Sequence, residues 1–304
     1  MNHHFLAWCL SSPWALRPET MLAYASVLAR RYGQRATAQS LEDDAPGAPS
    51  PAAAAPRAGT SGPRRGAIAV IPVHGAIVQR ASQINICDGG TSTQQISAAV
   101  RDALADETVS QILLDIDSPG GSVYGVGELA DEIRAARAQK PVVAIANSLA
   151  ASAAYWLATA ASEVYVTPGG EVGSIGVWMA HEDWSKALAE QGINVTLVSA
   201  GKYKVEGNPY GPLDADALAF LQQRTDDYYA AFTKAVAKGR SVPIDQVRGG
   251  MGQGRVLGAD QALAEKMVDG IATFDEVVKK MQRAQPARGR SALAAARNEL
   301  EILG

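Results

Sequence analysis

Four short segments of the chain have the apolar character of β-strands. They are AIAVIPV at 67–73, QILLDI at 111–116, PVVAIA at 141–146 and NVTLVS at 194–199. The first three are nearly continuous apolar runs, which are typical of strands covered on both faces. The pattern therefore predicts a sheet whose strands are spread over much of the chain.

Longer segments between and after these runs have apolar residues at helical spacing. They are 93–105, 122–137 and 214–240, the last being long and amphipathic. The apolar faces carry Ile96, Val100 and Leu104 in the first segment, and Val126, Leu129, Ile133 and Ala136 in the second. Strands that alternate with helices imply parallel pairing, so we expect an α/β fold.

The order of these elements divides the chain into four parts. We expect an N-terminal helical arm at 1–40, with its helix in ETMLAYASVLARRYG at 19–33. A linker rich in Pro, Ala, Gly and Ser follows at 41–66, because such a composition buries too little surface to order itself. The compact domain is expected at 67–282 and a loose tail at 283–304.

Composition narrows the classes of function. The 304 residues are 47% hydrophobic and 19% charged, which is enough apolar material for a full core. The net charge of −3 argues against a nucleic-acid partner. Cys9 and Cys87 form no CxxC pair and no two histidines have HxxxH spacing, so we expect neither a disulfide framework nor a metal site.

Two apolar stretches bear on a membrane location. The run at 5–16 and the stretch NSLAASAAYWLATAA at 147–161 are both shorter than the roughly 18 residues that a membrane-spanning helix needs. The first also lacks a basic region before it, unlike a secretory signal. The sequence therefore predicts a cytoplasmic protein without a membrane anchor.

Ser152 is the one serine inside the apolar stretch 149–158. It follows a predicted strand and precedes good helix formers, which places its Oγ near a helix N-terminus. There the free amides and the helix dipole favour negative charge on oxygen, and the amide of Ala153 would face a developing oxyanion. A core serine bonded to a carbonyl explains the same local pattern equally well.

Two further segments contain candidate partners for such a serine. DSPGGSVYG at 117–125 lies between a strand and a helix, and its glycines let bare backbone approach a ligand. SAGKYK at 199–204 contains Lys202 and Lys204. A lysine acts as a general base when burial lowers its pKa from about 10.4 towards 7 or 8. Taken singly, the first segment is also an ordinary turn and the second an ordinary solvated loop.

The ordered set of segments resembles a known family. DSPGGSVYG, NSLAASAAYWLATAASEVYV, GSIGVWM at 173–179, SAGKYK and GRVLGADQALAEKMVDGI at 254–271 are similar, in order and spacing, to segments of the signal peptide peptidase A family of Ser–Lys peptidases. The resemblance covers roughly 68–282. It implies a fold of the Clp protease and crotonase type, built of stacked ββα units.

The resemblance also implies roles for individual residues. It makes Ser152 the nucleophile and Lys204, rather than Lys202, the general base. The oxyanion hole would be formed by the amide of Ala153 with that of Gly120 or Gly121, of which Gly121 is favoured. No metal or other cofactor is implied, the substrates are polypeptides, and the subunits are expected to form a homo-oligomeric ring.

The segment VWMAHEDWS further resembles the branch of head-maturation proteases of tailed phages, which cleave scaffold and capsid-assembly proteins. Alternatives are a bacterial signal-peptide-peptidase-like protease, a crotonase-like enzyme acting on acyl-CoA, and a non-catalytic assembly component. His181, 29 residues after Ser152, offers an alternative base, with Asp183 or Asp117 as its candidate carboxylate partner. His74, Asp115 and Asp117 are expected to be structural.

Overall fold

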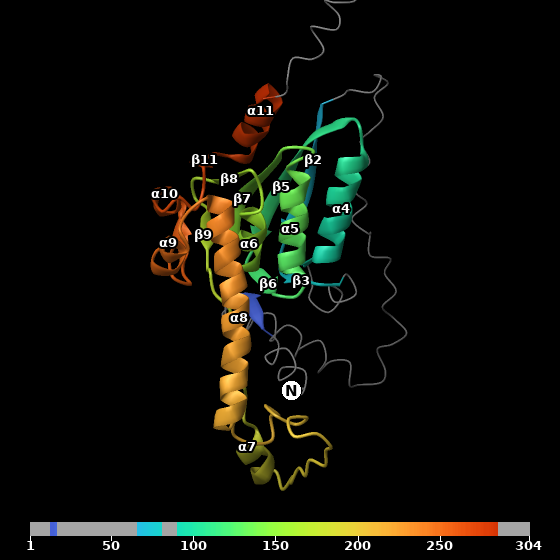
Figure 1. Cartoon of the computed structure of the whole chain (residues 1–304), viewed down its shortest axis with the longest axis vertical. Coiled ribbons are helices and arrows are strands. Elements are labelled where there is room, and N and C mark those ends of the chain that lie inside the picture. Colours follow the sequence, from blue (N-terminus) through green and yellow to red (C-terminus); the bar gives the residue numbers. More distant parts are fainter. Residues whose placement is uncertain (1–12, 17–65, 81–89, 285–304) are drawn as a thin grey trace, which may run out of the picture.

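The computed structural model describes residues 13–16, 66–80 and 90–284. In these ranges strands alternate with helices, and the helices cover a central sheet (Figure 1). The predicted α/β class is therefore confirmed. The predicted helix at 19–33, nearly all of the predicted linker and most of the predicted tail lie outside the described residues.

Within the described residues, the main sheet has seven strands. Its strands are β2 (Ala67–His74), β5 (Val109–Ser118), β7 (Val142–Ala151), β8 (Glu163–Val166), β9 (Glu171–Gly173), β10 (Val256–Gly258) and β11 (Gly270–Ile271). The order β10-β9-β7-β5-β2 runs across it, with β8 also beside β7 and β11 beside β8. The pairings are parallel except that of β10 with β9.

Strand β7 changes neighbours along its length. Its first half pairs with β8 through residues 143–146, whereas its second half pairs with β9 through residues 149–151. The chain then enters helix α6 (Ala153–Ala158). Ser152 therefore lies at the carboxyl end of a parallel strand, where open α/β sheets commonly place their sites.

A smaller four-stranded sheet lies at that end of the main sheet. Its order is β1-β6-β3-β4, with β1 at Trp14–Leu16, β6 at Gly120–Ser122, β3 at Ile77–Val78 and β4 at Thr91–Ser92. Strand β6 follows β5 after a single residue and pairs antiparallel with β1 and parallel with β3. The glycine turn of the sequence is thus a short strand between two others.

Of the helices in the described part of the chain, three pack on one face of the main sheet and one covers the other face. The first group is α4 (Thr93–Ala105), α5 (Val126–Ala136) and α6, and the single helix is α11 (Phe274–Ala284). Strand β5 shows both environments, because Leu113 packs in the cluster with α11 while its neighbours Ile112 and Leu114 belong to the main core. A strand covered on both sides explains the continuous apolar run at 111–116.

Helix α4 begins where its sequence specifies a start. The Ser92 side chain accepts from the amide of Gln95, and the Gln95 side chain in turn accepts from the Ser92 amide, which makes a capping box. Ile96 and Val100 on its apolar face are buried. Local sequence and core packing thus agree on this helix.

Helix α8 (Ala215–Arg240) extends well beyond the sheet (Figure 1). At its far end lie α7 (Ser185–Glu190) and the irregular segment that leads from α7 back to α8. We call residues 185–231 the arm; it is distinct from the N-terminal helical arm predicted at 1–40. Two short helices, α9 (Ile244–Gly249) and α10 (Ala259–Ala264), then return the chain to the sheet.

Most predicted elements have the expected positions, and three differ. The predicted strand at 194–199 is wrong, because this segment has no regular structure in a single chain. The helix predicted at 122–137 begins at Val126, since residues 120–122 form β6. The strand predicted at 141–146 continues to Ala151, so the first part of the small-residue stretch is strand rather than helix.

None of the helices within the described residues is long and apolar enough to span a membrane.

Candidate active site

Ser152 occupies a strained turn between β7 and α6. Its backbone has φ 56° and ψ −118°, which glycine adopts readily but which costs a residue with a Cβ of the order of 1–3 kcal/mol. Its side chain is almost completely buried, with 1% of the residue exposed. Strain of this kind persists only where the surroundings hold it, and it is common at catalytic residues.

Backbone contacts hold Ser152 in this conformation. Its amide donates to the carbonyl oxygen of Gly173 at 2.6 Å, and its carbonyl accepts from the amide of Trp156 at 2.9 Å. The hydroxyl has a weaker interaction, because Oγ lies 3.4 Å from the carbonyl oxygen of Gly176, which is long for an O–H···O hydrogen bond. The backbone is therefore fixed while Oγ remains available for chemistry.

Helix α6 holds Ser152 in place, because all six residues of the helix are buried and leave it little room to move. Small alanines let it approach its neighbours closely, and the ring of Trp156 stacks on Phe232 of α8 with centroids 4.8 Å apart. The Tyr155 hydroxyl donates to the carbonyl of Met267 at 2.8 Å, and burial raises the pKa of this phenol above its usual value. The sequence thus uses a helix of only six residues as a rigid support.

Gly120 lies directly beside the serine. Its φ is +99°, and a Cβ placed on it would be 2.9 Å from both Ser152 Cβ and the carbonyl oxygen of Ala151. Its amide donates to Ser118 Oγ at 3.2 Å, and Ser118 donates to the carbonyl of Gly75 at 2.6 Å. Only glycine fits at this position, as the sequence interpretation of the turn requires.

Gly121 and Ala153 complete the set of predicted oxyanion donors. A Cβ on Gly121 would be 1.9 Å from the carbonyl oxygen of Ile77, so the backbone of β3 covers that side of the glycine. Ala153 is the first residue of α6, and the first amides of a helix have no acceptor within it. The elements that carry the two residues, β6 and α6, pack against each other.

Lys204 is placed away from this group. It lies in the irregular part of the arm, is exposed, and its amide donates to the carbonyl of Gly201 at 3.2 Å. That loop borders Ala217 near the start of α8, whereas Phe232, which stacks on Trp156, lies 15 residues further on, or about 22 Å along the helix axis. A single chain therefore brings Gly120 to Ser152 but does not bring Lys204 there (Figure 1).

His181 also has a partner other than Ser152. Its Nε2 lies 2.9 Å from the carbonyl oxygen of Asn208 in the arm. Asp183, two residues further along the chain, accepts from the hydroxyl and amide of Ser185, and these hydrogen bonds lower the pKa of the carboxyl group. The described chain contains no contact between His181 and Ser152.

The polar side chains at the ends of β2 and β5 interact with one another. His74 Nε2 is 3.4 Å from Asp115 Oδ2. Asp115 also accepts from Asn147 at 3.1 Å, and Asp117 accepts from Ser148 at 3.0 Å. Within the described ranges, no three His, Cys, Asp or Glu side chains are grouped closely enough to hold a metal ion.

The sequence interpretation missed one feature of the site. Residues 14–16 form β1 and pair with β6, in register Ala15 opposite Gly121 and Leu16 opposite Gly120. The carbonyl oxygen of Ala15 is 2.2 Å from the point where a Cβ on Gly120 would lie. The apolar run at 5–16 was a signal of burial, but nothing in it indicated which strand it would meet.

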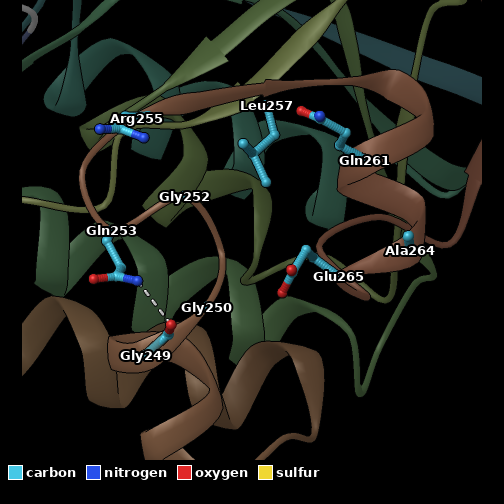
Figure 2. Close-up of a pocket in the computed structure, with 9 residues that line it drawn as sticks. All are labelled: Gly249, Gly250, Gly252, Gln253, Arg255, Leu257, Gln261, Ala264 and Glu265. Atoms are coloured by element: carbon cyan, nitrogen blue, oxygen red, sulfur yellow. Dashed lines mark hydrogen bonds between the residues drawn. The ribbon is translucent and has the colours of Figure 1, made fainter.

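A separate hollow of about 660 Å³ lies at the edge of the main sheet, between the loop 249–255 and α10 (Figure 2). In it the Gln253 side chain donates to the carbonyl of Gly249 at 2.8 Å, and Glu265 accepts from the amide of Met251 at 3.2 Å. None of the predicted site residues lines this hollow.

Two protein families have models that match parts of this chain. The family described as peptidase family S49 matches residues 134–288, and the family described as Clp protease matches residues 77–172. Together these ranges contain Gly120, Gly121, Ser152 and Lys204. The Clp protease match agrees with the predicted Clp-like α/β fold.

Curated proteins with similar sequences include phage and bacterial ones. Head-tail preconnector protein GP5 of Enterobacteria phage P21 is 36% identical over 254 residues, which cover 81% of this chain and 50% of that protein. Capsid assembly protease C of Escherichia phage lambda is 32% identical over 293 residues, covering 94% of this chain and 66% of that protein. Protease 4 of Salmonella typhi is 32% identical over 216 residues, covering 71% and 34%. The chain thus spans about half to two thirds of the length of the two phage relatives.

Proposed function

Because this chain belongs to peptidase family S49, we propose that it is a serine endopeptidase that cleaves peptide bonds through an acyl-enzyme. The observation that carries the proposal is the geometry of Ser152. A buried serine held at φ 56° beside Gly120, with a hydroxyl only weakly bonded, is the arrangement expected of a nucleophile.

The reaction proceeds in two steps. Ser152 Oγ attacks the scissile carbonyl carbon while its proton passes to Lys204 Nζ, and the amides of Gly121 and Ala153 donate to the oxyanion. Lys204 then gives the proton to the leaving amine, which departs as a new N-terminus. In the second step Lys204 Nζ takes a proton from a water molecule, which attacks the acyl carbon of the ester. The bond from this carbon to Ser152 Oγ breaks, the N-terminal fragment leaves as a carboxylic acid, and Lys204 returns the proton to Oγ.

The lysine of this dyad comes from a neighbouring subunit. Within one chain Lys204 lies on the arm, at the opposite end of α8 from the Trp156–Phe232 contact. The arm also exposes apolar side chains, including Val198 at 94% and Phe220 at 50%. Docking the arm on a second copy buries this surface, and the loss of water around the lysine favours its uncharged form. A head-to-tail contact of this kind generates the homo-oligomeric ring expected from the sequence.

The phage relatives suggest the class of substrate. Two of them are named as a capsid assembly protease and a head-tail preconnector protein. We therefore propose that this protein cleaves scaffold or capsid proteins during phage head assembly, in the cytoplasm of the host cell.

Loss of either dyad residue tests the chemistry. Ser152→Ala and Lys204→Ala are each expected to lower cleavage of unfolded casein by about 10³-fold or more. Both variants keep the fold, with changes in unfolding free energy below about 1 kcal/mol, because neither side chain makes a strong hydrogen bond in the described structure. His181→Ala is the control and retains activity. Normal cleavage by Lys204→Ala together with loss of cleavage in His181→Ala would contradict the assignment of the base.

Co-expression of the two inactive variants tests the origin of the lysine. A site that takes Ser152 from one chain and Lys204 from the next is intact in about one quarter of the positions of a randomly mixed ring. Cleavage at about a quarter of the wild-type rate is therefore expected from co-expressed Ser152→Ala and Lys204→Ala chains. Complete inactivity of the purified mixed oligomer would show that the two residues act within one chain.

A further inference from the structure

Strand β1 lies in a slot between two other segments of the site. On one side it pairs antiparallel with β6. On the other side Trp14 and Trp178 exchange both backbone hydrogen bonds, at 3.0 and 3.1 Å. The slot is thus one strand wide, and its two walls are β6 and the backbone of Trp178.

The backbone of β1 is aligned with the reacting groups. Successive residues of a strand point their N–H and C=O groups to opposite sides. Since those of Trp14 face Trp178, those of Ala15 face β6, where Ala15 is opposite Gly121. A Cβ placed on Gly120 would be 2.2 Å from the Ala15 carbonyl oxygen and 2.9 Å from Ser152 Cβ. Strand β1 and the serine therefore lie on either side of the same glycine.

The side chains of β1 show what the slot accepts. Ala15 is completely buried at 0% exposure, so its position has room only for a small residue. Trp14 is partly buried and packs with Trp178 and Ala180. Contacts made through the backbone, together with one small and one aromatic position, are typical of recognition of an extended peptide by strand addition.

We propose that Pro13–Leu16 is the chain's own occupant of the substrate slot and competes there with substrate peptides. The proposal rests on the proposed function in one respect, that Ser152 marks the reacting site. It adds a substrate class: extended segments with a small residue at the position of Ala15, preceded by a large apolar one. It also adds regulation, since the slot must be vacated before a substrate enters.

Tethering makes such competition effective with only modest affinity. A segment joined to its own binding site has an effective concentration of the order of 1 mM. If a free peptide of this sequence binds with a dissociation constant of about 0.1 mM, the tethered copy fills the slot about nine tenths of the time. The apparent dissociation constant of any competitor then rises about tenfold.

Peptide binding to the full-length Ser152→Ala protein tests the proposal without cleavage. The probe is a fluorescein-labelled peptide, SSPWALRP, which copies residues 11–18. Ala15→Arg, added to this background, places a long charged side chain where there is room only for a methyl group and expels β1. We expect it to bind the probe about tenfold more tightly than the parent. The matched control Ala105→Arg, at an exposed position of α4, binds like the parent.

Hydrogen exchange provides a second readout. The Trp178 amide is protected in the parent by its bond to Trp14. It is expected to exchange faster in Ala15→Arg and to be protected again by unlabelled peptide. Trp14→Ala, which removes the ring packed beside Trp178 and Ala180, is expected to give intermediate values and carries the test if Ala15→Arg fails to fold.

Equal affinity of the probe for Ala15→Arg and Ala105→Arg would overturn the proposal. The proposal would also be overturned if the Trp178 amide exchanged faster in Ala15→Arg but this variant bound no probe. Strand β1 would then be only a structural strand. Failure of the proposed function is a different result, namely cleavage that is absent or independent of Ser152 in the unsubstituted chain. Neither finding would alter the binding measured in the Ser152→Ala background.

Discussion

Ser152 combines a reactive hydroxyl with a backbone conformation that residues with a Cβ rarely adopt. The contacts that impose it are backbone bonds to Gly173 and Trp156 and the close approach of Gly120. A hydroxyl held in this way needs little rearrangement before it attacks a carbonyl. The strain is a cost in stability that the sequence retains at Ser152.

Two substitutions separate this strain from the loss of the hydroxyl. Ser152→Gly relieves about 1–3 kcal/mol of strain, partly offset by about 0.5–1 kcal/mol of chain entropy. We therefore expect Ser152→Gly to be more stable than Ser152→Ala by about 1 kcal/mol in urea unfolding. The control is Ala154→Gly inside α6, where glycine is expected to cost about 1 kcal/mol. If the change from alanine to glycine lowers the unfolding free energy equally at positions 152 and 154, Ser152 is unstrained.

Helix α8 is the element that joins the arm to the body of the domain. Its C-terminal part is fixed by the stacking of Phe232 on Trp156 and by Gly239, where a Cβ would be 2.1 Å from the carbonyl oxygen of Thr159. Arg240 adds two hydrogen bonds to Asp269, both 2.8 Å long. Figure 1 shows its N-terminal part running past the sheet towards α7. One end is therefore an anchor and the other is free to reach a neighbour.

The Arg240–Asp269 pair predicts a pH dependence of stability. Partial burial by itself would raise the pKa of Asp269, but hydrogen bonds from Arg240 and from the Val164 amide outweigh it and hold this pKa below 3.8. A carboxyl group with a lowered pKa stabilises the fold above its unfolded pKa, and this contribution is lost as the pH falls through the folded value. Asp269→Asn is expected to lower the unfolding free energy at pH 7 by about 1 kcal/mol, since the carboxylate is partly exposed.

Thermal unfolding at several pH values measures this effect. The difference between wild type and Asp269→Asn is expected to be constant from pH 7 to about 5 and to shrink below about pH 4. Asp102→Asn, on the exposed face of α4, is the control and changes little. A difference independent of pH would mean that the carboxylate charge is not responsible.

At the scale of the whole molecule, the two residues of the proposed dyad lie in separate parts of one chain. The sheet, Ser152 and the glycines form one part, and the arm with Lys204 forms another. The arm exposes Ile193, Val195, Leu197, Val198, Tyr203, Leu218 and Phe220. Such a surface is unusual on a monomer and is explained by the second copy that the proposed dyad requires.

Substitution on the arm tests assembly separately from folding. Val198→Asp combined with Phe220→Asp is expected to convert the oligomer to a monomer in light scattering, and to lower casein cleavage at least about tenfold. The melting temperature of the monomeric domain is expected to stay within a few degrees of its value in the unsubstituted chain. Leu263→Asp, an exposed apolar site on α10, serves as the control and leaves the oligomer intact. An unchanged oligomer in the double variant would exclude the arm as the interface.

Local patterns in the sequence predicted the elements that fix their own structure. The strands at 67–73 and 111–116 and the helices at 93–105 and 214–240 were found at nearly their observed bounds. Their periodicity and caps are properties of neighbouring residues. The segment 194–199 has the composition of a strand but no strand beside it in one chain, and a strand without a partner leaves its backbone groups unpaired.

The sequence by itself therefore determined the α/β class and the family, and it pointed to the segments that contain the proposed serine, glycines and lysine. Only the tertiary structure decided which of them meet. It placed Gly120 against Ser152, inserted residues 14–16 beside β6, and held Lys204 on an arm away from all three. The physical reason is that distances between segments far apart in the chain depend on packing of the whole core, which no local pattern encodes.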